Sequence, residues 1–400
     1  MRTVRLLRVA VALAIVVGAL IAAVRLVAPA DDPASVRRQL AFLRSELASG
    51  AAEDAQHLFP EGYFFSYALY GLSQVDLGLG EPPSERADEL REARWALAAL
   101  DSPAGRAPFD EGLTPAYGVF YRGWTNWLRG GVLSLQEARD PAEAARFERD
   151  SADLAAAFQQ SASPFLPAYP GQAWPVDSTV AIASLRLHDK LVGPRHAALT
   201  DRWVAAAKQR LDPGTGLLPH RADPATGAPI EVARGTSQSM IQRFLVDIDT
   251  AFAAQQYTVF REWFRPFGPA VREFPAGVSG AGDVDSGPLL LGISLSATAV
   301  TMGAARVQGD DRLAGALAGL AEVTGVPVDT PGTRRYAFGV LPIGDAFVAW
   351  SKTARPWVSA APAGPPPDLA WWWPLPILTV LFAAAALATR VAWRAARQLG

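Results

Sequence analysis

The sequence predicts an all-helical protein, an (α/α)6 toroid of alternating inner and outer helices flanked by one transmembrane helix at each end. Three observations support this fold class. Long uncharged segments lie near both termini, no segment shows the alternation of apolar and polar residues that is typical of strands, and two kinds of helical segment follow each other in strict alternation between the termini.

The N-terminal segment predicts a membrane anchor. Residues 1–8 carry three arginines, and residues 9–28 form an apolar run interrupted only by Arg25. A membrane-spanning helix needs about 20 apolar residues, and the long side chain of Arg25 is expected to reach the lipid headgroups. The small residues at 28–30 also fit a signal-peptide cleavage site. Both interpretations carry the following chain across the membrane.

The C-terminal segment predicts a second span. Residues 369–389 contain no charge, begin with a tryptophan cluster suited to the membrane interface, and precede a basic tail at 390–400. Basic flanks stay on the cytoplasmic side, so both ends are expected inside the cell and the domain at 33–358 outside it, with a proline-rich linker at 359–368. The alternative for the C-terminal segment is a buried apolar helix.

The amino-acid composition excludes several kinds of functional site. The chain has no cysteine, which excludes disulfides, thiolate metal sites and a cysteine nucleophile. Acidic and basic residues nearly balance, 39 against 37, so no overall field favours nucleic acid as a partner. The sequence predicts no cofactor and no metal, and it leaves the oligomeric state open.

The helical segments of the domain are of two kinds. The first kind has one charged face and comprises residues 36–49, 84–100, 141–161, 195–211, 257–264 and 310–324. The second kind is almost uncharged and comprises residues 63–77, 117–135, 178–191, 236–253, 286–307 and 344–354. Because an all-apolar helix must be buried and a polar-faced helix covers a surface, the alternation predicts an inner ring within an outer ring. The alternative is an irregular helical bundle.

The turns that enter the inner helices predict the position of a site. They combine glycine, proline, aromatic residues and isolated carboxylates, as in 60–71, 169–179 and 280–289. In a ring, these turns open on one face around a central cavity. We therefore expect three carboxylates to be catalytic: Asp177, Asp285 and Glu61. For each of them the alternative is simple capping of a helix N-terminus.

Substrate-binding residues are expected around these acids. Aromatic rings offer flat apolar surfaces for sugars, and polar side chains can orient them. The predicted set is Tyr63, Tyr121, Trp124, Trp174, Asp283 and His220. A solvent-exposed loop histidine is the alternative for His220, and Asp-x-Asp at 283–285 also permits a metal interpretation.

Other polar residues are expected to be structural. Asp345 is predicted to cap the last inner helix, and Asp247 and Asp249 to form a buried pair with Arg243. Ser237 has no histidine in its own motif, so a hydrolase triad is not predicted.

A tryptophan-rich toroid with acidic residues opening several inner helices resembles the six-hairpin glycosidases and polysaccharide lyases, such as glucoamylases and unsaturated glucuronyl hydrolases. It also resembles the linalool dehydratase-isomerase family. The resemblance covers the whole domain in architecture but includes no family-specific motif, and the missing cysteines depart from the terpenoid family.

Three functions follow as hypotheses. The resemblance implies an enzyme acting on a cell-envelope glycan, with two carboxylates as general acid and as base or nucleophile. The second hypothesis is a non-catalytic receptor or scaffold with an aromatic-lined cavity. The third is an enzyme acting on a lipid or terpenoid.

Overall fold

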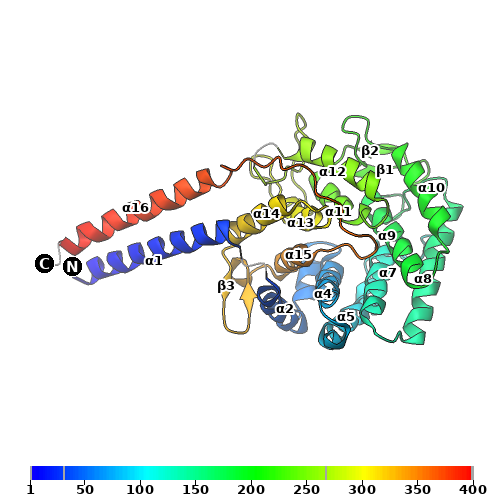
Figure 1. Ribbon diagram of the computed structural model, residues 1–400, viewed down its shortest axis with the longest axis horizontal. Coiled ribbons are helices and arrows are strands. Elements are labelled where there is room, and N and C mark those ends of the chain that lie inside the picture. The colour runs from blue at the N-terminus through cyan, green and yellow to red at the C-terminus, as the bar shows by residue number, and fades with distance from the viewer. Residues whose placement is uncertain (1, 30–31, 266–267, 398–400) are drawn as a thin grey trace.

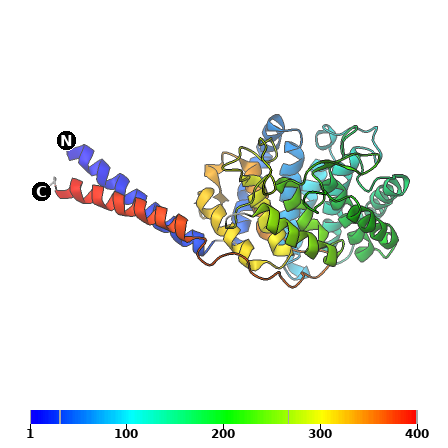
Figure 2. The same ribbon diagram turned by 90° about the horizontal axis from the view of Figure 1, so that it is seen from above.

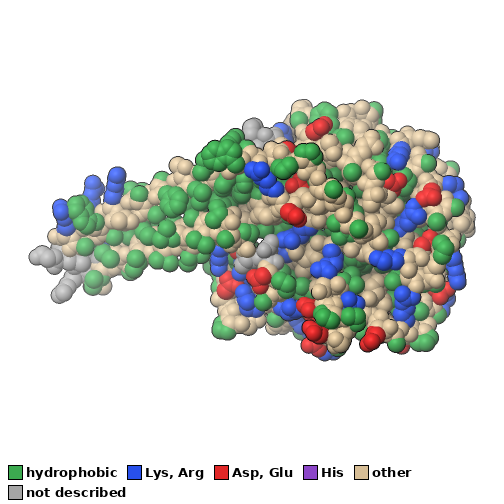
Figure 3. Space-filling view, viewed as in Figure 1, with side chains coloured by type: hydrophobic (Ala, Val, Ile, Leu, Met, Phe, Trp, Pro, Cys, Tyr) green, Lys and Arg blue, Asp and Glu red, His purple; other side chains and the backbone are tan. Residues whose placement is uncertain are grey.

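Two long terminal helices extend side by side from a helical domain in the computed structural model (Figure 1), which describes residues 2–29, 32–265 and 268–397. They are α1, Arg2–Val27, and α16, Leu375–Arg397. Both are long and apolar enough to cross a membrane, and large apolar side chains such as Val380 remain exposed along them (Figure 3). The C-terminal apolar helix begins at Leu375, later than the expected Leu369, because the tryptophan cluster before it forms a turn.

Six mostly buried helices occupy the interior of the domain. Each packs against the next in the order α4, α7, α9, α11, α13 and α15, and α15 packs against α4. Their apolar and small side chains face neighbours on all sides, as expected for helices without a charged face. Their bounds are Gly62–Gly78, Gly118–Leu135, Pro175–Leu191, Gly235–Leu245, Leu295–Val307 and Pro342–Thr353.

Amphipathic helices cover this interior. In α8, for example, Phe147, Leu154 and Phe158 are buried while the opposite face carries charges. The covering helices are α2 (Pro33–Ala48), α3 (Ala51–Leu58), α5 (Ala87–Leu100), α8 (Pro141–Gln160), α10 (Ala197–Lys208), α12 (Thr250–Phe264) and α14 (Asp311–Thr324). The helical prediction is confirmed.

Short elements complete the described chain. Two antiparallel pairs of strands were not expected from the sequence: β1 (Arg221–Ala222) with β2 (Pro229–Glu231), and β3 (Val328–Asp329) with β4 (Arg334–Arg335). They are too short for an alternating pattern to stand out. The remaining helical turns are η1 (Pro83–Glu85), α6 (Pro103–Arg106) and η2 (Ala337–Gly339).

Two predicted inner helices have different bounds. The segment 236–253 breaks after Leu245, because Asp249 accepts a hydrogen bond from the Phe252 N–H and starts α12. The segment 286–307 becomes helical only at Leu295, where Ser294 is the N-cap. Asp285 therefore lies in the preceding loop and does not cap that helix.

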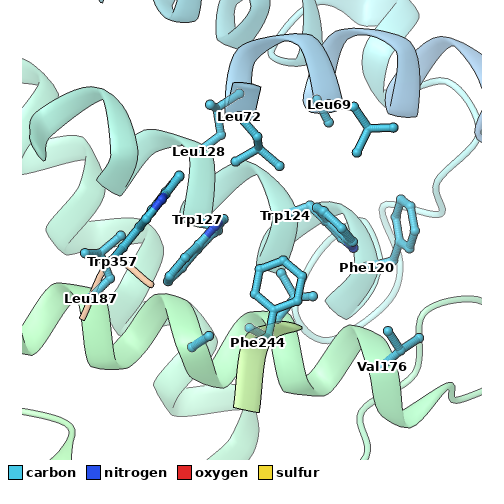
Figure 4. Packing of buried hydrophobic residues seen from close by; sticks show 14 of the residues in the cluster. Leu69, Leu72, Phe120, Trp124, Trp127, Leu128, Val176, Leu187, Phe244 and Trp357 are labelled. Carbon is cyan, nitrogen blue, oxygen red and sulfur yellow. The ribbon is translucent and has the colours of Figure 1, made fainter. Parts of the chain in front are cut away.

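The core between the inner helices is aromatic (Figure 4). Trp127 and Trp357 stack with ring centroids 4.4 Å apart and planes 7° apart. Phe244 meets Trp124 edge to face, and Trp124 is only 1% exposed. Buried aromatic pairs of this kind add about 0.5–1.5 kcal/mol each beyond their buried area. The interior that the sequence predicts as a cavity wall is here a packed core.

The segment after α15 is held on the domain along its length (Figure 1). Asp247 accepts the backbone N–H groups of Trp357, Val358 and Ser359, and Arg261 donates to Asp368 at 3.0 Å. The sequence analysis expected Asp247 to pair with Arg243, but Asp247 binds these backbone N–H groups and Arg243 binds Asp76. The proline-rich residues 359–368 connect α15 to α16 as a docked strap.

The terminal helices and the domain meet at a defined junction. Arg25 donates to the Pro327 carbonyl at 2.8 Å and to Asp329 at 2.7 Å. This arginine therefore contacts the domain, in place of the expected reach to the headgroups. A Cβ on Gly319 would lie 2.1 Å from the Leu26 carbonyl oxygen, so α14 can approach α1 this closely only with glycine there.

Candidate active site

Three carboxylates at or before the starts of inner helices influence one another electrostatically. Glu61 is the N-cap residue of α4, Asp177 lies in the first turn of α9, and Asp285 lies in the loop before α13. Each of Glu61 and Asp285 raises the pKa of Asp177 by charge repulsion, and Glu61 does the same to Asp285. The three residues predicted as catalytic are therefore electrostatic neighbours.

Asp177 is the most deeply placed of the three. It is the third residue of α9, whose N-cap is Trp174, and it is 4% exposed. Burial raises its pKa well above the usual range, repulsion by Glu61 and Asp285 adds to this, and the Trp124 indole offsets a part. The Trp124 Nε1 nevertheless makes no hydrogen bond of normal geometry within the described ranges. Asp177 is thus a buried acid whose surroundings favour the protonated form over the ionised one.

Asp285 differs from Asp177 in its access to solvent. Asp285 is an exposed residue, yet partial loss of water around its carboxyl group raises its pKa to about 6. Repulsion by Asp283 and Glu61 adds to this rise, and attraction by Arg234 opposes it. A carboxylate with such a pKa is largely ionised at neutral pH and can accept a proton. The pair of Asp177 and Asp285 therefore offers an acid and a base.

Tyr169 ties Glu61 to the loop before α9. Its hydroxyl donates a hydrogen bond to Glu61 Oε1, and its ring meets Trp174 edge to face at 5.8 Å. Burial and the nearby carboxylates raise the pKa of Tyr169 far above its ordinary value. The phenol consequently stays protonated and remains a donor.

A second polar group adjoins the carboxylates. His220 Nδ1 lies 2.5 Å from Ser237 Oγ. Arg234 pairs with Glu273 at 2.7 Å and with Asp283 at 2.6 Å. Burial and the charge of Arg234 lower the pKa of His220 to about 3, so its imidazole is neutral. The charge of Arg234 also lowers the pKa of Asp285, so Arg234 links this second polar group to the three carboxylates.

Residues of this second group depart from the sequence analysis in two ways. His220 is buried, which excludes the solvent-exposed alternative, and it supplies the partner that Ser237 was not expected to have. Asp283 pairs with Arg234, so this carboxylate is engaged by a cation. The sequence analysis missed Arg234 and Glu273, which lie 39 residues apart in the chain and carry no local motif.

Three predicted binding aromatics lie in the core. Tyr63, Tyr121 and Trp124 are all buried, and the Tyr121 hydroxyl donates to the Leu100 carbonyl at 3.1 Å. They stabilise the helix ends that carry the acids and offer no free ring face. Trp174 is half-buried, as are Phe65 and Phe347, whose rings lie 5.7 Å apart.

Asp345 has a different role from the expected cap. Leu341 is the N-cap residue of α15, and Asp345 accepts hydrogen bonds from the Tyr336 N–H at 2.9 Å and from Gln39 at 3.2 Å. Burial raises its pKa to about 7. Asp345 joins α15 to α2 and to the loop before α15.

Comparison of the sequence with protein-family models gives no match, and comparison with curated proteins gives none of significant similarity.

Proposed function

We propose that this chain is a membrane-anchored enzyme that hydrolyses or cleaves a glycan of the cell envelope, with its helical domain outside the cytoplasm. The observation that carries the proposal is Asp177, a buried carboxyl group held beside two further carboxylates with no cation among the groups that shift its pKa. Such an uncompensated acid lowers stability, and sites of this kind are typical of acid–base catalysis.

The architecture proposed for the domain is the α/α toroid. The cyclic order of contacts from α4 through α15 and back to α4 supports a closed ring. The amphipathic helices outside this order support an outer layer. In such a ring the helix N-termini that carry Glu61 and Asp177 lie on one face, which is where the carboxylates meet.

The proposed topology follows from the terminal helices. Both chain ends lie at the same end of the helix pair, away from the domain (Figure 2). Arg8 flanks the first span and Arg390, Arg394 and Arg397 lie at the end of the second. Basic flanks favour the cytoplasmic side. The packing of α1 on α16 and on α14 supports an uncleaved anchor.

Reporter fusions test this topology. A fusion after residue 30 and one before Asp368 should report the outside, and one after residue 400 the inside. A cytoplasmic signal from the fusion before Asp368 would overturn the proposed location.

In the proposed reaction, Asp177 protonates the glycosidic oxygen as the bond to the sugar carbon breaks. Asp285 acts on the other side of the sugar, either by removing a proton from the attacking water or by attacking the sugar carbon itself. Glu61, held by Tyr169, adds negative charge that stabilises a developing oxocarbenium ion. The half-buried rings of Trp174, Phe65 and Phe347 supply surfaces for sugar stacking.

The enzymatic test uses the full chain in detergent and a panel of envelope oligosaccharides, with release of reducing ends as the readout. Asp177→Asn and Asp285→Asn should each reduce turnover by about 10²–10⁴-fold, since an amide neither donates nor accepts the proton. Asp249→Asn is the matched control, because Asp249 caps α12 away from these acids. Full turnover in both site variants, or binding of oligosaccharides without any turnover by the parent chain, contradicts an enzymatic role.

A further inference from the structure

A second cluster of chemically active side chains lies at the end of α9 that is opposite to Asp177. His188 and Asp189 belong to the last turn of α9, and His196 is the N-cap residue of α10. One ligand atom from each of these residues lies within 4.8 Å of the others. The cluster thus joins the end of an inner helix to the start of the next outer helix.

The two imidazole rings lie close together at a tilt. Their centroids lie 4.6 Å apart at an interplanar angle of 57°. His188 is 1% exposed and approaches Asp189 through Nδ1 at 3.3 Å. Among the residues that the structure describes, the His196 ring makes no hydrogen bond. The half-buried His196 ring therefore has nitrogens available as ligands beside the buried His188.

Asp189 is held in a fixed orientation beside the two histidines. Its Oδ1 accepts the backbone N–H groups of Arg195 and His196, both at 3.0 Å. These bonds hold the carboxylate in place and leave further lone pairs, as the outer-shell partners of metal ligands do. The C-terminal end of a helix carries partial negative charge and favours a cation.

We propose that His188, Asp189 and His196 bind a divalent transition-metal ion, with Zn²⁺ as the principal occupant. Two imidazole nitrogens and one carboxylate oxygen suit Zn²⁺, with water as the fourth ligand. Ca²⁺ and Mg²⁺ prefer all-oxygen sites. Tetrahedral ligands of Zn²⁺ lie roughly 3.3–3.5 Å apart, so the three side chains close around the ion by small rotations.

The consequence of this site is structural. A bound ion clamps the loop between α9 and α10 and so fixes the C-terminal end of the helix that carries Asp177. It lies at the opposite end of α9 from the proposed catalytic residues and does not depend on the proposed function.

The experiment measures Zn²⁺ binding to the untagged full chain in detergent, after chelator treatment, by equilibrium dialysis with metal analysis. Co²⁺ substitution adds a visible absorption spectrum that reports tetrahedral coordination. The test variant is His196→Ala. The matched control is His57→Ala, because His57 is an exposed histidine outside the cluster.

The parent chain and His57→Ala should bind one ion and unfold at a higher temperature with Zn²⁺ than without it. His196→Ala should bind at least about tenfold more weakly and show no Zn²⁺-dependent stabilisation, while its circular dichroism stays helical. If His196→Ala does not fold, His196→Gln serves in its place. No stoichiometric binding by the parent chain, or equal loss in both variants, overturns the site.

Discussion

The carboxylates buried beside the segment after α15 and the one buried at the start of α9 have different surroundings. Around the strap after α15, each has donors that match its charge. Asp76 accepts from Arg243 at 2.8 Å and from the Trp357 indole at 2.7 Å, and Asp247 accepts three backbone N–H groups. At the start of α9, Asp177 has two carboxylates as neighbours.

The difference lies in whether hydrogen-bond donors or other acids surround the buried carboxyl group. Burial raises the pKa of Asp76 to about 6, but Arg243 and Trp357 oppose the rise. Repulsion at Asp177 acts in the same direction as burial, and only the Trp124 indole opposes them. A buried charge is tolerated where donors surround it, whereas a buried acid beside other acids is retained for another reason, and proton transfer is the one we propose.

The largest expected effect is on Asp76. Asp76→Ala leaves the Arg243 guanidinium buried without its carboxylate, and we expect the free energy of unfolding to fall by about 3–5 kcal/mol. Denaturant unfolding followed by tryptophan fluorescence measures this. The control is Asp88→Ala, which removes an exposed carboxylate on α5. Equal stability of the two variants would contradict the view that Asp76 stabilises the fold by compensating the buried Arg243 charge.

A smaller effect is expected at Asp249, which caps α12 and lies 4.0 Å from the half-exposed Lys208 ammonium group. Asp249→Ala removes the acceptor for the Phe252 N–H, and the free energy of unfolding should fall by about 1 kcal/mol. Asp249→Asn should restore nearly all of it, since asparagine caps equally well. If asparagine is as harmful as alanine, the charge of Asp249 matters and it is not a simple cap.

The smallest effect on stability is expected for Asp177→Asn near pH 5, within about 1 kcal/mol, because a neutral amide replaces a protonated carboxyl group. The pH dependence of stability distinguishes the parent chain from Asp177→Asn. Above its ordinary pKa of 3.8 the unfolded chain releases the Asp177 proton, while the folded chain, with its raised pKa, retains it. The stability of the parent therefore falls as pH rises toward the folded pKa.

Asp177→Asn lacks this contribution, so it should gain stability relative to the parent as pH rises from the ordinary pKa of 3.8 toward the raised folded pKa. Thermal unfolding of both chains across this range tests the sign. A variant that instead loses stability relative to the parent as pH rises would show that ionised Asp177 is stabilised by a partner.

Local composition determined a large part of this protein. The two apolar terminal segments and the alternation of uncharged and amphipathic helices depend on runs and periods within 15–25 residues, so the sequence predicts them directly. The same holds for the position of Glu61 and Asp177 at helix starts. Turns need glycine, proline and short polar residues, and these mark helix boundaries in the sequence.

Only the tertiary structure decided which groups meet. Tyr169 donates a hydrogen bond to Glu61, which is 108 residues away in the sequence. Arg243 pairs with Asp76, 167 residues away, and not with Asp247, which is close in the sequence. An aromatic residue at helical spacing fits a cavity wall and a core equally well, so Trp124 could be assigned to the core only once its neighbours were placed. Partners distant in the chain leave no local pattern, because the contact is selected by the packing of whole helices.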